Sequence, residues 1–206
     1  MKNAIATISV LALLAGCASS GTNQVQADLP VDKGTVSAGS AVTLKGNEMP
    51  LAGWGMVEVG QPLPEAILSN TSLQPVNIAD NGGKVRIISV VPSLDTPTCD
   101  RQTHELSEEN GGLDEKVELI TVSMDLPFAQ SRFAKEAKIN NVTFLSDYKE
   151  REFGNNNGLI VEPLGLLARA VIVTDKDDIV RYLQVVPELT ALPDMQAAMQ
   201  AARDLL

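Results

Sequence analysis

The chain has 206 residues, of which 44% are hydrophobic, so it can form one domain of ordinary size with a buried core. Its net charge of −10 argues against nucleic acid as a partner, because phosphate binding requires clustered Lys and Arg side chains. One His and two Cys leave almost no nitrogen or sulfur ligands for zinc, so we expect no metal site, and we expect no cofactor either.

Residues 1–17 have the pattern of a bacterial export signal. Met1-Lys2-Asn3 is a short positively charged start, residues 4–14 are apolar but too few to span a bilayer, and Leu14-Ala15-Gly16-Cys17 follows directly. This order resembles a lipoprotein signal peptide over residues 1–16. The resemblance implies cleavage before Cys17 and a lipid on its sulfur. Because Ala18 comes next, it also implies attachment to the outer membrane, on the periplasmic side. The alternative is an ordinary secretory signal with an incidental Cys.

Residues 17–40 are expected to be the lipidated Cys and a flexible tether, because the segment is rich in small polar residues and has no apolar period. About 20 residues of such coil span roughly 25 Å on average, which holds a small domain clear of a membrane surface. Residues 41–206 are expected to form the folded domain.

The domain begins with a predicted β-hairpin over residues 41–51, where an alternating pattern surrounds Lys45-Gly46-Asn47. Trp54 follows between two glycines. It could stack on a ligand, but we expect it to fill the edge of the core. The remaining elements are strands at 66–68, 76–78, 84–91, 117–123, 142–145, 168–174 and 179–186, and helices at 98–110, 127–134, 148–153 and 193–206.

This order of elements begins with parallel βαβ units and ends with an antiparallel hairpin around residues 175–178. It predicts an α/β protein with a mixed central sheet and helices on both faces. That arrangement is the thioredoxin-like fold, here with an N-terminal β-hairpin extension.

Cys99 lies where the buried strand at 84–91 leads into the helix at 98–110. Free backbone N–H groups at a helix N-terminus favour the thiolate form of a cysteine. If Cys17 carries a lipid, Cys99 is a lone thiol in an exported protein, where cysteines usually pair. A buried, inert Cys is the alternative. The polar neighbours Asp95, Thr96 and Asp100 argue against it.

The motif Pro92-x-x-x-Thr96-x-x-Cys99 resembles the active-site motif of peroxiredoxins, and the chain is similar to their atypical two-cysteine branch, the bacterial thiol peroxidases. The further matching pieces are Thr43–Asn47, Met124–Phe133 and Leu166–Val173. The resemblance implies that Cys99 is the peroxidatic cysteine, Thr96 the peroxide-orienting hydroxyl and Pro92 the shielding residue. Arg169 is then the arginine that contacts sulfur and peroxide. Without the resemblance, Arg169 could equally be a surface residue of a strand.

Ala134 stands where the family has its resolving cysteine, so the family's intramolecular disulfide cannot form. We therefore expect a peroxidase that reduces hydrogen peroxide and organic hydroperoxides with Cys99 alone. An external thiol resolves it, either a thioredoxin-like protein or a small thiol, or else Cys99 of a second subunit does, since the family commonly dimerises. His104 is expected to lie on the surface without a catalytic role.

Two other functions remain open at this stage. The chain could be a non-catalytic envelope lipoprotein that keeps the fold as a binding module, which the missing resolving thiol favours. A thiol–disulfide oxidoreductase is disfavoured, because Thr96-Pro97-Thr98-Cys99 lacks the other Cys of a C-x-x-C pair.

Overall fold

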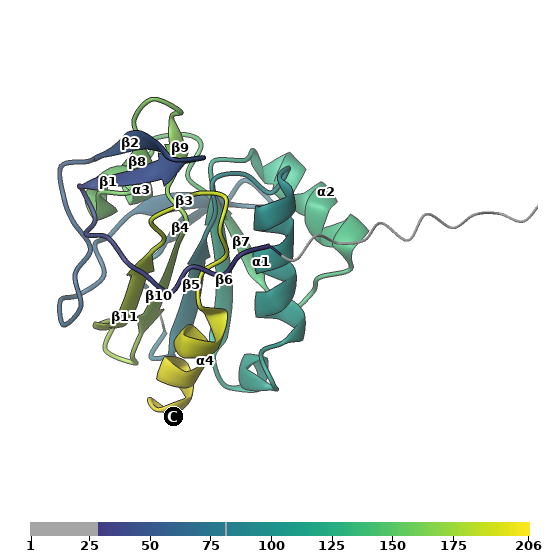
Figure 1. Ribbon diagram of the computed structural model, residues 1–206. Helices are drawn as coiled ribbons and strands as arrows, with labels where there is room; N and C mark the ends of the chain where they lie inside the picture. Colours follow the sequence, from purple (N-terminus) through teal and green to yellow (C-terminus); the bar gives the residue numbers. More distant parts are fainter. Residues whose placement is uncertain (1–28, 81) are drawn as a thin grey trace, which may run out of the picture.

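The computed structural model describes residues 29–80 and 82–206, so the expected signal peptide and Cys17 lie outside the described residues (Figure 1). The helices are α1 (Pro97–Glu108), α2 (Pro127–Ala137), α3 (Glu152–Asn157), α4 (Met195–Arg203) and the 3-10 turn η1 (Leu113–Glu115). The strands are β1 (Ala41–Leu44), β2 (Asn47–Ala52), β3 (Ile67–Asn70), β4 (Pro75–Asn77), β5 (Arg86–Val90), β6 (Glu118–Ser123), β7 (Thr143–Ser146), β8 (Ile160–Val161), β9 (Leu166–Leu167), β10 (Ala170–Thr174) and β11 (Val180–Val185).

The larger sheet has, within the described residues, seven strands in the order β11-β10-β5-β6-β7-β3-β4. Strands β5, β6 and β7 run parallel, whereas β10 is antiparallel to β5 and to β11. All five residues of β5 and of β10 are buried, as expected for continuous apolar strands at the centre of a sheet. The predicted mixed sheet and its thioredoxin-like arrangement are confirmed.

Each face of the larger sheet is covered by a different layer. Helices α1, α2 and α4 share one face, where Ile87, Leu119 and Val173 point into their core cluster. The opposite face bears Ile88, Ile120 and their neighbours, and it packs against α3 and the small sheet. Figure 1 shows the small sheet on one side of the central strands and α1 and α2 on the other.

The small sheet contains the predicted N-terminal hairpin, β1 and β2, with β8 and β9 added beside it in the order β1-β2-β8-β9. The sequence pattern did not predict β8 or β9. Each is two residues long, which is too short to show an alternation of apolar and polar residues.

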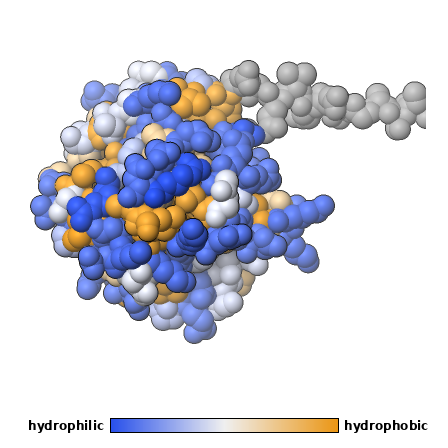
Figure 2. All heavy atoms as spheres, turned by 90° about the horizontal axis from the view of Figure 1, so that it is seen from below, coloured by the Kyte–Doolittle hydropathy of each residue, from blue (hydrophilic) through white to orange (hydrophobic). Residues whose placement is uncertain are grey.

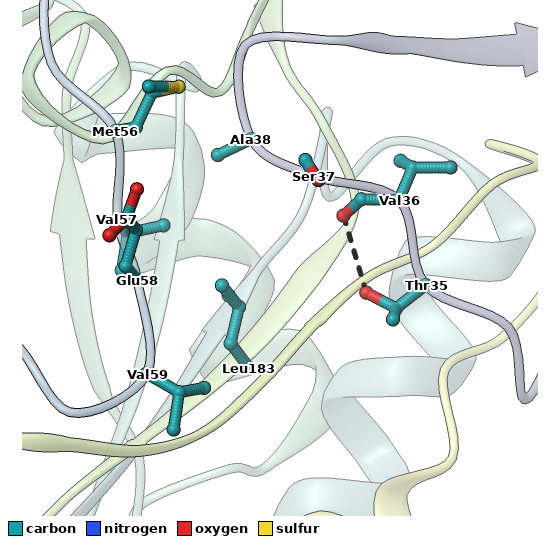
Figure 3. A pocket seen from close by; sticks show the side chains of 9 residues that line it. All are labelled: Thr35, Val36, Ser37, Ala38, Met56, Val57, Glu58, Val59 and Leu183. Carbon is teal, nitrogen blue, oxygen red and sulfur yellow. Dashed lines mark hydrogen bonds between the residues drawn. The ribbon is translucent and has the colours of Figure 1, made fainter.

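The expected tether is wrong in its C-terminal part, because residues 31–40 lie against the domain. The backbone N–H groups of Asp32, Val36 and Gly39 donate to the carbonyls of Leu192, Val185 and Gly158 at 2.8, 3.0 and 2.9 Å. Figure 3 shows residues 35–38 facing residues 56–59 and Leu183 across a hollow of about 410 Å³. The folded domain therefore begins before residue 41.

The prediction that Trp54 fills the core edge is also wrong, since 75% of this residue is exposed. Its neighbours explain why. Side chains at Gly53 and Gly55 would overlap the carbonyl oxygens of Asn155 and Asn156, so both glycines let the chain lie directly against the end of α3. The backbone occupies the space that the indole was expected to fill, and the indole Nε1 donates to Asn156 Oδ1 at 2.5 Å.

Helix α3 is displaced towards the C-terminus from its predicted range of 148–153. The buried carboxylate of Asp147 accepts hydrogen bonds from the backbone N–H groups of Phe153 and Gly154 at 3.1 and 2.8 Å, which sets the start of the helix. Gly154 lies inside the helix, and any side chain there would overlap Ile160 and Leu167, so the position requires a glycine.

The surface of the molecule is mixed in character. On the side seen from below in Figure 2, a central apolar area is surrounded by hydrophilic side chains. In the two described stretches, 29–80 and 82–206, no helix is both long and apolar enough to cross a bilayer.

Candidate active site

Cys99 lies at the edge of the larger sheet where the parallel strands end. The segment after β5 carries Pro92, and α1 then begins with Pro97 at its first position, which places Cys99 in the first turn. Backbone N–H groups of a first helical turn have no partner within the helix, so they favour an anion there. The residue itself is 0% exposed.

Arg169, which directly precedes β10, is brought to the same edge because β10 pairs antiparallel with β5 and Ala170 lies opposite Val90. Its Nη2 lies 3.4 Å from the Sγ of Cys99. The guanidinium also donates to the Leu189 carbonyl from Nε at 3.1 Å and from Nη2 at 2.8 Å. Only 2% of Arg169 is exposed, so the alternative of a surface residue is wrong.

Gln102, which was not among the predicted site residues, completes the support of Arg169. Its Oε1 accepts from Arg169 Nη1 at 2.7 Å, while its Nε2 donates to Ser89 Oγ on β5 at 2.8 Å. A residue three positions after Cys99 on a helix lies on nearly the same side as the thiol. That spacing was the available signal. The Leu189 carbonyl had none, because any residue type supplies a carbonyl.

Pro92 and Thr96 both lie in the loop that connects β5 to α1. Thr96 is the N-cap residue of α1 and is exposed, with its hydroxyl donating to the Ser93 carbonyl at 3.3 Å. The hydroxyl is therefore engaged with the loop, not with the sulfur. Pro92, near the start of the same loop, is buried.

Asp125, a second residue absent from the predicted site, fastens this loop to the end of β6. Its carboxylate accepts from Ser93 Oγ and from the Leu94 N–H, both at 2.7 Å. The signal was its place after β6, since the ends of neighbouring parallel strands meet at one edge. Beside it, a hollow of about 210 Å³ is lined by Ser93, Leu94, Asp95, Asp125, Ala129, Arg132, Phe133 and Glu136.

Ala134 lies on α2, half-buried, and packs against the same core cluster that contains Cys99. Its neighbour Phe133 makes an edge-to-face contact with Phe144 at a centroid distance of 6.0 Å, which fixes α2 on the sheet. Within residues 29–80 and 82–206, Cys99 is the one free cysteine.

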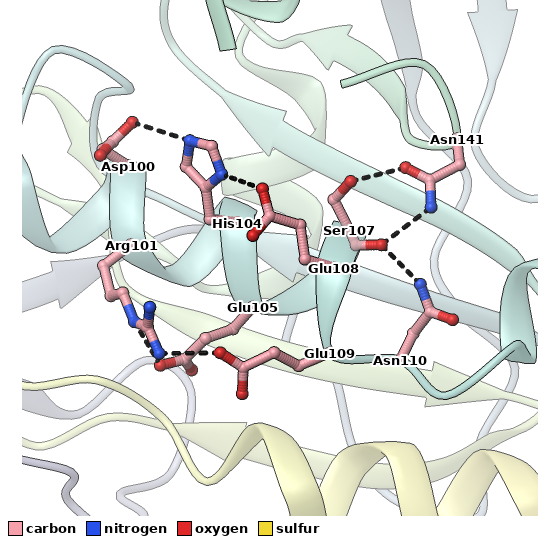
Figure 4. A network of polar contacts seen from close by, with 9 residues as sticks. All are labelled: Asp100, Arg101, His104, Glu105, Ser107, Glu108, Glu109, Asn110 and Asn141. Atoms are coloured by element: carbon pink, nitrogen blue, oxygen red, sulfur yellow. Dashed lines mark hydrogen bonds and ion pairs between the residues drawn. The ribbon is translucent and has the colours of Figure 1, made fainter. Parts of the chain in front are cut away.

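His104 lies in the solvent-side network of α1, as Figure 4 shows. Its Nδ1 is 2.8 Å from Glu108 Oε1, and its Nε2 is 3.6 Å from Asp100 Oδ1. A neighbouring set on the same helix joins Arg101 to Glu105 and Glu109 at 2.9 and 2.8 Å. These contacts confirm that His104 belongs to the surface of the helix.

Comparison with known proteins identifies the family. Residues 58–199 match the Redoxin family model. The thiol peroxidase of Halalkalibacterium halodurans is 45% identical over 81% of this chain and 99% of its own length, and that of Staphylococcus saprophyticus is 42% identical over 80% and 98%. The crystal structure of a peroxiredoxin-like protein from Aquifex aeolicus covers 84% of this chain and 100% of its own, with 38% identity and a TM-score of 0.77.

These likenesses extend over the strands and helices that bring Cys99 and Arg169 together. They imply a peroxide as the substrate and a thiol as the reductant. The chain belongs to the thiol peroxidase family of the peroxiredoxins and is a peroxiredoxin-type enzyme.

Proposed function

We propose that the protein reduces hydrogen peroxide and organic hydroperoxides with Cys99 as its peroxidatic thiol. The observation that carries this proposal is the guanidinium of Arg169, whose Nη2 lies 3.4 Å from the sulfur. A buried positive charge beside the sulfur favours the thiolate and also stabilises the negative charge that develops on the leaving oxygen of the peroxide.

The first half-reaction follows from that placement. The Cys99 thiolate attacks one peroxide oxygen, the O–O bond breaks, and the other oxygen takes a proton and leaves as water or an alcohol. The sulfur is oxidised to a sulfenic acid and the peroxide is reduced. Thr96 orients the peroxide once its hydroxyl leaves the Ser93 carbonyl, and Pro92 excludes water from beneath the site.

The second half-reaction needs a thiol from outside the chain, because α2 presents Ala134 to the core that holds Cys99. That thiol attacks the sulfenic sulfur, water leaves, and a mixed disulfide forms. A second thiol then releases Cys99. Since Cys99 is fully buried, the first turn of α1 has to open for the mixed disulfide to form. A thioredoxin-like protein, a small thiol or Cys99 of a second copy can act as resolver.

The proposed location is the periplasmic side of the outer membrane, held by a lipid on Cys17 after removal of residues 1–16. The support is the order of charged, apolar and small residues before that Cys. Fatty-acid labelling in cells tests it. Label is expected on the wild-type chain and absent from Cys17→Ser, whereas label on both would contradict the anchor.

The decisive test of the peroxidatic step is mass spectrometry of the Cys99 peptide after one equivalent of peroxide. Rapid formation of a sulfenic acid is expected, and Cys99→Ser should consume peroxide at least about a thousandfold more slowly. An inert Cys99 thiol would instead identify a non-catalytic binding protein. Assays with thioredoxin, glutathione and a small dithiol then identify the reductant.

Ala134→Cys tests the resolution step. It should form a disulfide with Cys99 after peroxide treatment, detected as a loss of 2 Da. It should also protect Cys99 from sulfinic acid, with Ala137→Cys on the same helix as the control. Resistance of the wild-type Cys99 to sulfinic acid in the absence of any added thiol would contradict the proposed absence of an internal resolver.

A further inference from the structure

Glu188 binds an unusual number of donors for a half-buried residue outside the candidate site. Its carboxylate accepts five hydrogen bonds of 2.8 to 3.1 Å, and the donors are Thr43 Oγ1, Lys45 N, Gly46 N, Thr190 N and Thr190 Oγ1. Two of these donors are backbone N–H groups of the turn between β1 and β2. The carboxylate thus fastens the N-terminal hairpin to the segment at residues 187–190.

That segment is also the support of Arg169. The carbonyl of Leu189, the residue next to Glu188, accepts the hydrogen bonds from Nε and Nη2 of Arg169. On its other side, Leu189 N donates to the Thr43 carbonyl at 2.8 Å, and Thr43 N donates to the Pro187 carbonyl at 2.6 Å. Thr98 beside the thiol donates to the Thr190 carbonyl at 3.4 Å.

The segment therefore lies between two neighbours of different kinds. The hairpin holds one side through Glu188 and Thr43, and the guanidinium of Arg169 is held by the other. Any displacement of residues 187–190 moves the Leu189 carbonyl and the guanidinium with it. An arginine has several rotatable bonds, so without this carbonyl Gln102 would be the one oxygen acceptor left, among the described residues, to hold the guanidinium beside the sulfur.

The ionised form of Glu188 is the form that can accept hydrogen bonds from all five donors. Although partial burial alone would raise its pKa, the hydrogen bonds from Lys45, Thr190 and Gly46 lower the pKa to about 2. The side chain is therefore a carboxylate at every physiological pH, with acceptors only and no donor of its own.

We propose that Glu188 is a positioning residue of the peroxidatic site, which holds the Leu189 carbonyl so that the guanidinium of Arg169 stays against the Cys99 sulfur. The proposal rests on the function proposed above for Arg169. It also gives the N-terminal hairpin a role in the reaction, because the hairpin turn is the anchor for the carboxylate.

Glu188→Gln tests the proposal, because the amide keeps the size of the side chain but turns an NH₂ donor towards backbone N–H donors. Glu48→Gln, at an exposed position on β2 opposite Thr43, is the matched control. Two rates are measured on the full chain at pH 7: the reaction of Cys99 with hydrogen peroxide, and the alkylation of the Cys99 peptide by iodoacetamide, followed by mass spectrometry.

Both rates are expected to fall about tenfold in Glu188→Gln, since a small misplacement of a catalytic group is costly, and to stay unchanged in Glu48→Gln. A lower denaturation midpoint with both Cys99 rates unchanged would overturn the proposal and show that Glu188 contributes to stability alone. If wild type fails to react with peroxide but alkylation still slows in Glu188→Gln, the proposed function fails while the positioning role stands. If Glu188→Gln does not fold, the same two rates are measured in Thr43→Val, which removes the hydroxyl that donates to Glu188.

Discussion

Two buried arginines lie at opposite ends of the same pair of strands, and they serve different purposes. Arg86, at the start of β5, is 1% exposed and lies opposite Thr174 at the end of β10. It forms an ion pair with Asp178 and donates to the Ile78 carbonyl and to Thr174 Oγ1. Arg169, before the start of β10, donates to an amide oxygen, a carbonyl and the Cys99 sulfur.

The difference between them is the counter-charge. Burial lowers the pKa of Arg86, and the carboxylate of Asp178 opposes that effect, so its charge is neutralised within the fold. Within the described part of the chain, Arg169 forms no salt bridge. A buried guanidinium with only neutral acceptors keeps its charge available, and the thiolate of Cys99 is the anion placed to use it.

Arg86→Met tests the structural role of the first arginine and should destabilise the fold. Removal of one partner of a buried ion pair leaves the other uncompensated, so we expect a loss of about 3–5 kcal/mol in the free energy of unfolding. The pair of the exposed Arg181 with the half-buried Asp175 supplies the control, since Arg181→Met should cost less than about 1 kcal/mol. Denaturant unfolding measures both, and equal small losses would contradict a structural role for Arg86.

Asp147 extends the comparison to a buried carboxylate held mainly by backbone N–H groups. Burial raises its pKa to about 6, from 3.8, and the hydrogen bonds from Gly154 and Phe153 only partly oppose this. Between pH 4 and 6 the folded state therefore binds more protons than the unfolded state, so stability falls as the pH rises through this window.

Asp147→Asn should remove this pH dependence. Relative to the variant, wild type is expected to lose about 2 kcal/mol between pH 4 and pH 7, since about two pKa units separate the folded and unfolded states and part of this difference lies below pH 4. Urea unfolding at a series of pH values measures the difference. A difference that is constant with pH would show that Asp147 titrates normally in the fold.

Arg169→Lys tests the role of the second arginine in the reaction of Cys99 with peroxide. A lysine keeps the positive charge, but its single nitrogen cannot replace the contacts that three guanidinium nitrogens make to the sulfur, Gln102 and Leu189, so the peroxide reaction of Cys99 should slow about a hundredfold. Arg101→Lys, on the exposed side of α1, is the control and should leave the rate unchanged. Stopped-flow measurement with hydrogen peroxide decides, and a wild-type rate in Arg169→Lys would show that charge alone suffices.

Gln102→Leu should slow the peroxide reaction less than Arg169→Lys does. It removes one hydrogen bond to a charged group, worth about 1.5 kcal/mol, while the Leu189 carbonyl still holds the guanidinium, so a rate loss of about tenfold is expected. Ser89→Ala, which removes only the other partner of Gln102, should slow the reaction less. The reverse order of the two variants would mean that Gln102 acts through β5 instead of through Arg169.

The sequence predicted the central strands well because they are continuous apolar runs. It also predicted α1, which begins at a proline and is followed by Gly111 and Gly112 in left-handed conformation. It failed where long-range contacts override local pattern. Gly53 and Gly55 lie against α3 and turn Trp54 outward, and Asp147 places the start of α3 from outside the helix.

Residue types and spacing determined by themselves that Cys99 begins a helix after a buried strand, and that Ala134 leaves α2 without a thiol. Whether Arg169 reaches the sulfur could not follow from spacing, because 70 residues separate the two in the chain. The tertiary structure decided that through the pairing of β10 with β5. It also decided that Leu189 and Gln102 hold the guanidinium and that Glu188 joins the hairpin turn to the segment of Leu189, since a backbone carbonyl or a shared carboxylate has no local signature in sequence.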